Sequence, residues 1–214
     1  FGLGDLEVSY NDKLLAYSLD LKGSEYYTIR IRDIKRREQV GEKIENTSGG
    51  ITFSLDDKYI FYSKLDDNHR PRKIYRHEIG TPTSKDILIF KEESEAFTVG
   101  IGLSSDEKYF FITSSDHNTS EQYYFKADEI IPNPKIIDKR KRGIIYSVNS
   151  WNGNFYKHTN EDAEDFKIEK TKDLEKNEWE SFIPAREEVL IGGLIFLNNW
   201  IIRSETSNAL SKLI

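Results

Sequence analysis

The stretch GITFSLDDKYIFYSKL, residues 50–65, contains two short runs of β-branched and aromatic residues separated by an acidic turn. Such runs, bounded by Asp, Asn, Ser or Gly, are typical of β-strands, and the turn at 55–58 joins them as a hairpin. Almost the same hairpin returns along the chain, with successive turns 45 to 50 residues apart. The equivalent turn positions are Lys13, Lys58, Lys108, Asn154 and Asn199. A period of this length indicates a solenoid or a propeller.

Two further runs follow each of the first four hairpins and complete a unit of four short strands. The third runs are residues 26–34, 72–79, 121–130 and 164–174, and the fourth runs are residues 42–46, 86–92, 134–139 and 179–184. Four strands at this period predict an all-β chain of antiparallel β-propeller blades. We expect four four-stranded blades and the start of a fifth, at residues 6–46, 51–93, 98–138, 145–184 and 188–214. A closed four-bladed ring is the alternative.

Composition narrows the classes of partner. The 214 residues carry a formal net charge of −6, which disfavours nucleic acid because phosphate binding needs a basic surface. No apolar run of about 18 residues is present, so we expect no membrane span. The N-terminus lacks the order of a signal peptide, and the chain has no cysteine, so a cytoplasmic location is expected. The absence of methionine suggests a piece of a longer protein.

Residue chemistry points to a scaffold without catalytic residues. The chain contains no G-x-S-x-G motif, and NTSGG at 46–50 is expected to serve as a turn between blades. The four histidines, His69, His77, His117 and His158, do not pair at metal-ligand spacing, so neither a metal nor a cofactor is predicted. His77 alternates with Tyr75 and Ile79, which favours a packing or surface role. The basic run at 139–142 is expected to be an exposed connection.

Two stretches resemble the N-terminal propeller of the prolyl oligopeptidase family. LLAYSLDLKGSEYYTIRIRDI, residues 14–34, follows the family's L-A-[YF]-x-x-D-x-x-G-x-E-x-Y pattern. IYRHEIGTPTSKDILIFKE, residues 74–92, is similar to the W-R-H-x-[IL]-G-T-P run of the oligopeptidase B (protease II) branch, with Tyr75 in place of Trp. Residues 179–202 match that branch in spacing, whereas SETSNALSKL, residues 204–213, departs from its usual pattern.

The resemblance implies a seven-bladed propeller, of which this chain holds about four and a half blades. In the family the propeller covers an α/β-hydrolase domain with a Ser-Asp-His triad and admits only short peptides, which the oligopeptidase B branch cleaves after Arg and Lys. The expected partners are therefore that hydrolase domain and short cationic peptides. Self-association through the cut propeller faces is a further expectation. The alternative is a free-standing propeller that serves as an interaction scaffold without peptidase activity.

The resemblance also indicates which face meets the catalytic domain. This face carries the crossings between blades and the loops that join the second to the third strand of a blade. Phe97 and Thr98 match positions near the bound peptide in the family, and Asp116 and His117 occupy the tip of a similar loop. These four are the candidate cavity-facing residues, and no catalytic or metal-binding residue is assigned.

Overall fold

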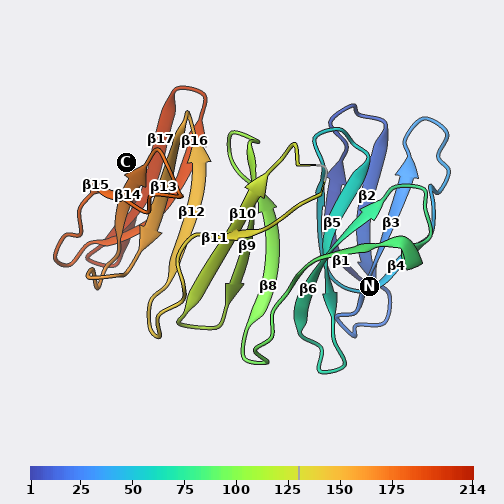
Figure 1. Cartoon of the computed structure of the whole chain (residues 1–214), viewed down its shortest axis with the longest axis horizontal. Helices are drawn as coiled ribbons and strands as arrows, with labels where there is room; N and C mark the ends of the chain where they lie inside the picture. The colour runs from blue at the N-terminus through green and yellow to red at the C-terminus, as the bar shows by residue number, and fades with distance from the viewer. Residues whose placement is uncertain (130) are drawn as a thin grey trace. The chain divides into compact units, whose positions relative to one another are not determined.

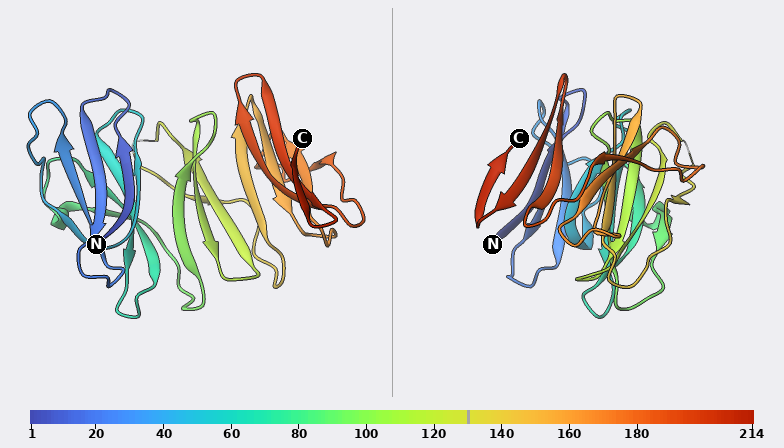
Figure 2. Two further views of the ribbon diagram at one scale, coloured as in Figure 1. Left: turned by 180° about the vertical axis from the view of Figure 1, so that it is seen from behind. Right: turned by 90° about the vertical axis from the view of Figure 1, so that its left-hand side faces the viewer.

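The computed structural model describes residues 1–129 and 131–214, and within these it consists of β-strands and connecting loops (Figures 1 and 2). The described residues contain no α-helix, and one short 3-10 helix covers Thr83–Lys85. The all-β, antiparallel architecture predicted from the sequence is confirmed. Residue 130, the last of the predicted run 121–130, lies outside the described residues.

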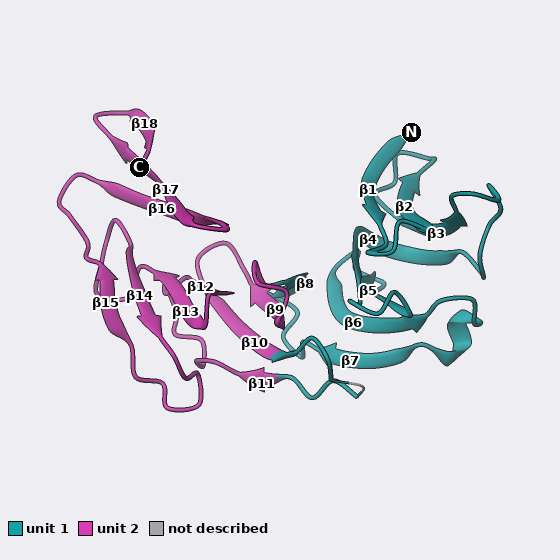
Figure 3. Cartoon of the chain, turned by 90° about the horizontal axis from the view of Figure 1, so that it is seen from above, with its two compact units in different colours: residues 1–103, 125–134 teal, residues 104–124, 135–214 magenta. Residues whose placement is uncertain are grey.

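The chain divides into two compact units, each of which is described by itself (Figure 3). Unit 1 comprises residues 1–103 and 125–134, and unit 2 comprises residues 104–124 and 135–214. One four-stranded antiparallel sheet has the order β11-β10-β9-β8. Its strands are β8 (Thr98–Leu103), β9 (Tyr109–Ser115), β10 (Ser120–Lys126) and β11 (Lys135–Ile136).

Unit 1 is built on a seven-stranded antiparallel sheet in which the strands follow chain order. The strands are β1 (Gly2–Val8), β2 (Leu14–Asp20), β3 (Tyr27–Asp33), β4 (Ile44–Phe53), β5 (Tyr59–Leu65), β6 (Pro71–Glu78) and β7 (Ile87–Lys91). Alternating apolar side chains from these strands form one buried cluster: Ala16, Ile29, Ile31, Ile44, Ile51, Phe53, Ile60 and Tyr62. Each large member contributes about 1.5–3 kcal/mol on burial, so this cluster stabilises the sheet of unit 1.

Strand β4 belongs to two hairpins at once. Its Thr47 pairs with Tyr27 of β3 on one side and with Lys64 of β5 on the other, and the register shifts before Ile51. Gly49 permits the bend because its φ is +99° and a Cβ there would lie 3.0 Å from the Tyr27 ring. The predicted turn at 46–50 is therefore wrong: the chain passes between the first two predicted blades as continuous strand.

Unit 2 contains two further antiparallel sheets. One has the order β12-β13-β14-β15 and the other the order β16-β17-β18. Their strands are β12 (Tyr146–Trp151), β13 (Asn154–Thr159), β14 (Lys167–Thr171), β15 (Glu180–Ile183), β16 (Leu190–Leu197), β17 (Trp200–Ser207) and β18 (Leu210–Leu213). The sequence predicted the β16–β17 hairpin but not β18. The blade boundaries as such stay predictions.

The hairpin turns explain the opening stretch of sequence. Ser54 Oγ donates to the Asp56 carboxylate at 2.7 Å and accepts from the Tyr59 N–H at 3.0 Å, while Asp57 occupies the left-handed region at φ 57°. The same Ser-x-Asp/Asn arrangement recurs at residues 9–11 and 104–106. The acidic turn is thus a side-chain cap that lets the strand reverse within a few residues.

Candidate functional site

Two kinds of connection between strands leave from the same end of each predicted blade. In an antiparallel blade, the loop from the second to the third strand and the crossing to the next blade leave from the same end. In unit 1 these connections are residues 21–26, 66–70 and 92–97, and in unit 2 they are residues 116–119, 137–145 and 160–166. We call them the loop-lined end of unit 1 and the loop-lined end of unit 2.

An acidic or amide side chain opens each of these strand-to-strand loops. The carboxylate of Asp116 accepts the N–H groups of Asn118 and Thr119 at 2.9 and 2.7 Å. The Asn118 N–H is the main reason that the pKa of Asp116 lies below its usual value, and the Thr119 N–H and the charge of Arg140 lower it further. Asp20 and Asp66 cap the equivalent loops in the same way, whereas Asn160 opens its loop but directs its side chain to the 143–145 residues of the crossing. A side-chain cap of this kind fixes the loop without regular secondary structure.

The four candidate residues fall into two pairs, one in each unit. Phe97 ends the 92–97 crossing of unit 1 with its N–H directed at the Ser94 carbonyl at 3.4 Å, and Thr98 begins β8; both side chains are half-buried. Asp116 and His117 form the start and tip of a loop in unit 2, where the His117 side chain is exposed. The contact of these residues with a peptide stays a prediction.

Arginines hold the crossing of unit 1. Arg70 Nη2 donates to the Ala96 carbonyl at 3.1 Å, and Arg72 Nη1 approaches the Glu93 carbonyl at 3.5 Å. Arg72 is itself fixed by its Nε, which donates to Asp66 at 2.7 Å. This arrangement was not predicted from the sequence. The string Arg70-Pro71-Arg72, at the end of the loop that Asp66 opens, is the feature of the sequence that could have indicated it.

Neutral side chains hold residues 143–145 of the unit 2 crossing, whereas at residue 140 the N–H of Arg140 donates to the Glu121 carboxylate at 3.0 Å. Asn160 accepts the Ile145 N–H at 2.7 Å and donates to the Gly143 carbonyl at 3.0 Å, and Thr119 Oγ1 accepts the Gly143 N–H at 3.1 Å. The basic run 139–142 lies on this crossing, where Lys139 and Arg142 are exposed and Lys141 pairs with Glu161. The predicted exposed connection therefore holds for Lys139, Lys141 and Arg142, whereas Arg140 is half-buried beside Glu121.

A repeated hydrogen bond joins the second strand of one predicted blade to the first strand of the next. Ser18 Oγ donates to the Gly49 carbonyl at 2.7 Å, and Ser63 Oγ donates to the Val99 carbonyl at 3.1 Å. In unit 2 an imidazole takes this place, with His158 Nε2 2.7 Å from the Ile191 carbonyl. Burial lowers the pKa of His158, so its ring is neutral at pH 7.

His77 packs inside unit 1. It is fully buried, its Nδ1 lies 2.6 Å from Asp86, and the hydroxyl of Tyr62 donates to the same carboxylate at 2.8 Å. Burial raises the pKa of Tyr62, so the phenol stays protonated. His77 Nε2 is buried and makes no hydrogen bond. Of the two predicted roles for His77, the structure supports packing.

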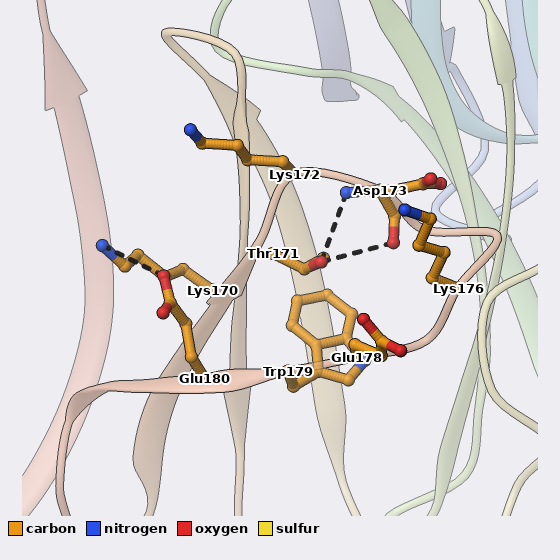
Figure 4. Close-up of a pocket in the computed structure, with 8 residues that line it drawn as sticks. All are labelled: Lys170, Thr171, Lys172, Asp173, Lys176, Glu178, Trp179 and Glu180. Carbon is orange, nitrogen blue, oxygen red and sulfur yellow. Dashed lines mark hydrogen bonds and ion pairs between the residues drawn. The ribbon is translucent and has the colours of Figure 1, made fainter.

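Two shallow depressions accompany these elements. A depression of about 530 Å³ lies beside the 21–26 loop of unit 1, where Lys43 and Glu45 form an ion pair at 2.6 Å. A second, of about 360 Å³, lies at the β14–β15 loop of unit 2, around Trp179 (Figure 4). Its three lysines are matched by three acidic side chains, so it has no net charge. Within residues 1–129 and 131–214, no cluster of three or more His, Cys, Asp or Glu could hold a metal, and no helix is long and apolar enough to span a membrane.

Comparison with known proteins identifies the family. The model of the family described as "Prolyl oligopeptidase, N-terminal beta-propeller domain" matches residues 1–214. The chain is 31% identical to Protease 2 of Moraxella lacunata over 193 residues, which is 84% of this chain and 28% of that protein. It is 29% identical to Dipeptidyl aminopeptidase BI of Pseudoxanthomonas mexicana, over 100% of this chain and 30% of that protein.

Solved structures agree with this assignment. Oligopeptidase B from Leishmania major superposes with a TM-score of 0.94 at 21% identity, and oligopeptidase B from Trypanosoma brucei with a TM-score of 0.90 at 26% identity. Each comparison covers 99% of this chain and 30% of the other. The chain thus spans less than a third of the length of these relatives. It belongs to the family of N-terminal β-propeller domains of prolyl oligopeptidases.

Proposed function

We propose that this chain is the propeller lid and size filter of a cytoplasmic serine oligopeptidase that cleaves short peptides after Arg or Lys. The family match over residues 1–214 carries the proposal, and the likeness to Protease 2 and to oligopeptidase B supports the choice of branch. In this role the chain supplies no catalytic residue. An α/β-hydrolase domain of the same protein provides the serine chemistry, and the lid keeps water and large folded proteins away from it.

The loop-lined end of each unit is the part that we propose faces the hydrolase domain and the peptide. Asp67 in unit 1 and Asp162 in unit 2 lie on these loops with exposed carboxylates. Exposed negative charge attracts a cationic peptide over several ångströms, and the attraction weakens as salt is added. Phe97 and Thr98 are the proposed contacts in unit 1, and Asp116 and His117 are the proposed contacts in unit 2.

The test uses the complete reading frame that contains this chain. The purified protein is assayed on a short Arg-containing fluorogenic peptide and on a folded protein substrate, before and after Phe97→Ala and Asp116→Ala. We expect cleavage of the peptide alone, and a loss of kcat/KM in both variants. Values within about twofold of the parent for both variants, a transition-state effect under about 0.5 kcal/mol, would remove support for this face. The 214-residue chain by itself should show no turnover.

A second candidate, a free-standing interaction scaffold, is favoured by the exposed apolar side chains of the first and last strands. Leu3 and Leu6 of β1 are 56% and 53% exposed, and Trp200 and Leu213 of the last sheet are 72% and 71% exposed. The reading frame beyond residue 214 distinguishes the two candidates. A downstream G-G-S-x-G-G motif with later Asp and His favours the oligopeptidase, and its absence favours the scaffold.

The same exposed side chains lead us to propose that the isolated chain self-associates with a second copy. Burying apolar surface yields about 25 cal/mol per Å², so a few hundred Å² covered on each copy is worth several kcal/mol. Light scattering of the 214-residue chain should therefore show dimers or larger species at micromolar concentration. A monodisperse, high-melting monomer would contradict the proposal.

A further inference from the structure

The 93–97 segment of unit 1 crosses from β7 to β8 without regular structure, yet it carries Phe97. Residues 92–97 belong to no strand, and within this segment the Ser94 N–H donates to Glu92 Oε1 at 2.7 Å. The Phe97 N–H bond to Ser94 is long, at 3.4 Å. These bonds define a tight turn, and the Glu92 N–H ties its start to β6 by donating to the Arg72 carbonyl at 2.9 Å. Side chains from a neighbouring loop and strand also reach the carbonyls of the turn.

Arg70, which ends the neighbouring loop, and Arg72, at the start of β6, help to fix this turn. Arg70 and Arg72 approach the crossing at two points, the carbonyls of Ala96 and Glu93. A guanidinium is planar and carries several donors in a fixed fork. Two such groups, each bonded to a different carbonyl, restrict both the position and the orientation of the segment relative to β6. We refer to Arg70, Arg72 and Asp66 as the arginine clamp.

Asp66 keeps the clamp in place. Its Oδ1 accepts the N–H groups of Asn68 and Arg70, each at 2.9 Å, and its Oδ2 accepts the Nε–H of Arg72 at 2.7 Å. Partial burial raises the pKa of Asp66, but these backbone and guanidinium donors together lower it below its usual value. The side chains of Arg72 and Asp66 are only 19% and 17% exposed. One carboxylate therefore shapes the loop and orients an arginine that reaches the crossing.

We infer that Arg70 and Arg72 are positioning residues that fix the 93–97 crossing, and with it Phe97, for the binding of a short peptide. This inference rests on the proposed function. Neither arginine needs to touch the peptide: the clamp acts by presenting Phe97 in one orientation before the peptide arrives. Preorganisation of this kind improves affinity because the loop need not be ordered on binding.

The first test measures how well the 93–97 crossing is held, and it does not require enzymatic activity. Hydrogen exchange of the amides 94–98 is compared in the 214-residue chain and its Arg70→Ala, Arg72→Ala and Arg72→Lys variants. We expect exchange about tenfold faster in both Ala variants and an intermediate rate for Arg72→Lys, which keeps the charge but loses the fork. The matched control is Arg36→Ala, an exposed arginine of another unit 1 loop, which should leave these amides unchanged. Rates within about twofold of the parent in both Ala variants would overturn the clamp.

The second test measures its consequence in the complete reading frame. Each Ala variant should raise KM for a short Arg peptide about fivefold with kcat within about twofold, since the clamp acts on peptide binding and not on the chemical step. Arg72→Lys should recover part of the loss. Faster exchange with unchanged KM would show that the clamp is purely structural and would overturn its role in binding. If the parent protein cleaves no peptide, the proposed function fails, while the exchange experiment still decides the clamp.

Discussion

The crossings of the two units do the same structural work with different chemistry. In unit 1 the 93–97 segment is held by two charged arginines, Arg70 from the 66–70 loop and Arg72 from β6. In unit 2 residues 143–145 of the crossing are held by the amide of Asn160 and the hydroxyl of Thr119. The side chains that join successive hairpins show the reverse pattern. In unit 1 they are serines, which do not titrate, and in unit 2 the side chain is a histidine, which does. We therefore expect added salt to promote local opening of the unit 1 crossing, and acid to lower the stability of unit 2.

Of the changes that we propose, removal of the Tyr146 hydroxyl should lower the free energy of unfolding of unit 2 the most. This hydroxyl accepts the N–H groups of Gln122 and Asp138, at 2.8 and 3.2 Å, and donates to the Asp138 carbonyl at 2.6 Å. Tyr146→Phe leaves these buried backbone groups without their partner, at an expected cost of about 3 kcal/mol in the free energy of unfolding.

Urea denaturation followed by tryptophan fluorescence measures this effect, because all three tryptophans, Trp151, Trp179 and Trp200, lie in unit 2. Tyr26→Phe is the control, since Tyr26 lies in unit 1 and no hydrogen bond depends on its hydroxyl in the described structure. It should stay within about 0.5 kcal/mol of the parent. Equal midpoints for Tyr146→Phe and the parent would mean that the crossing does not limit the stability of unit 2.

Asn160→Ala should have the second largest effect. It removes the acceptor for the Ile145 N–H and the donor to the Gly143 carbonyl, and we expect unit 2 to lose about 1–2 kcal/mol. Because both bonds are between neutral groups, the loss should be the same in 0.05 M and in 1 M salt, within error. A loss that shrinks strongly with salt would contradict the neutral character that we assign to the Asn160 bonds.

The unit 1 crossing should respond to salt in the unmodified chain. Arg72 and Asp66 lose part of their attraction when ions screen them. Hydrogen exchange of amides 94–97 should therefore accelerate about threefold between 0.05 M and 1 M NaCl, equivalent to about 0.7 kcal/mol of local opening. Amides 143–145 of unit 2 are the internal reference. Equal acceleration at both crossings would remove the distinction between them.

The sequence predicted the hairpins well because each is specified locally. Ser54, Asp56 and Asp57 supply the cap and the left-handed residue within one turn, and apolar alternation supplies the strands on either side. The loop after Asp116 was located by the same kind of local signal, and its cap is visible in the structure.

Features that depend on distant residues were missed. The arginine clamp joins Arg70 to a carbonyl 26 positions away, which no local pattern encodes. The continuity of β4 was hidden because T-S-G-G has the composition of a turn, whereas its pairing with both β3 and β5 makes it strand. His77 was expected to pack or to lie at the surface, and its partner Asp86 comes from the following loop. Tertiary pairing, more than local propensity, decides such cases.

The smallest effect we predict is that of acid on unit 2. Burial lowers the pKa of His158 below its ordinary value of 6.5, so between these two pKa values the unfolded chain binds more protons than the folded one. The stability of unit 2 is then complete above about pH 6.5 and falls as the pH drops toward the folded pKa. The fall is limited because a protonated imidazole still donates from Nε2 to the Ile191 carbonyl.

Tryptophan-detected urea midpoints between pH 7.5 and pH 5 test this prediction. His158→Gln keeps an N–H donor that cannot titrate, so its midpoint should vary less with pH than that of the parent. His117→Gln is the matched control, because His117 is the other histidine of unit 2 and its side chain is exposed on a loop. Its pH dependence should follow the parent. A different outcome is that His117→Gln flattens the dependence of the midpoint on pH and His158→Gln does not. The bond between β13 and β16 would then not be the acid-sensitive element of unit 2. The contrast with the serine bonds of unit 1 would have no consequence for stability.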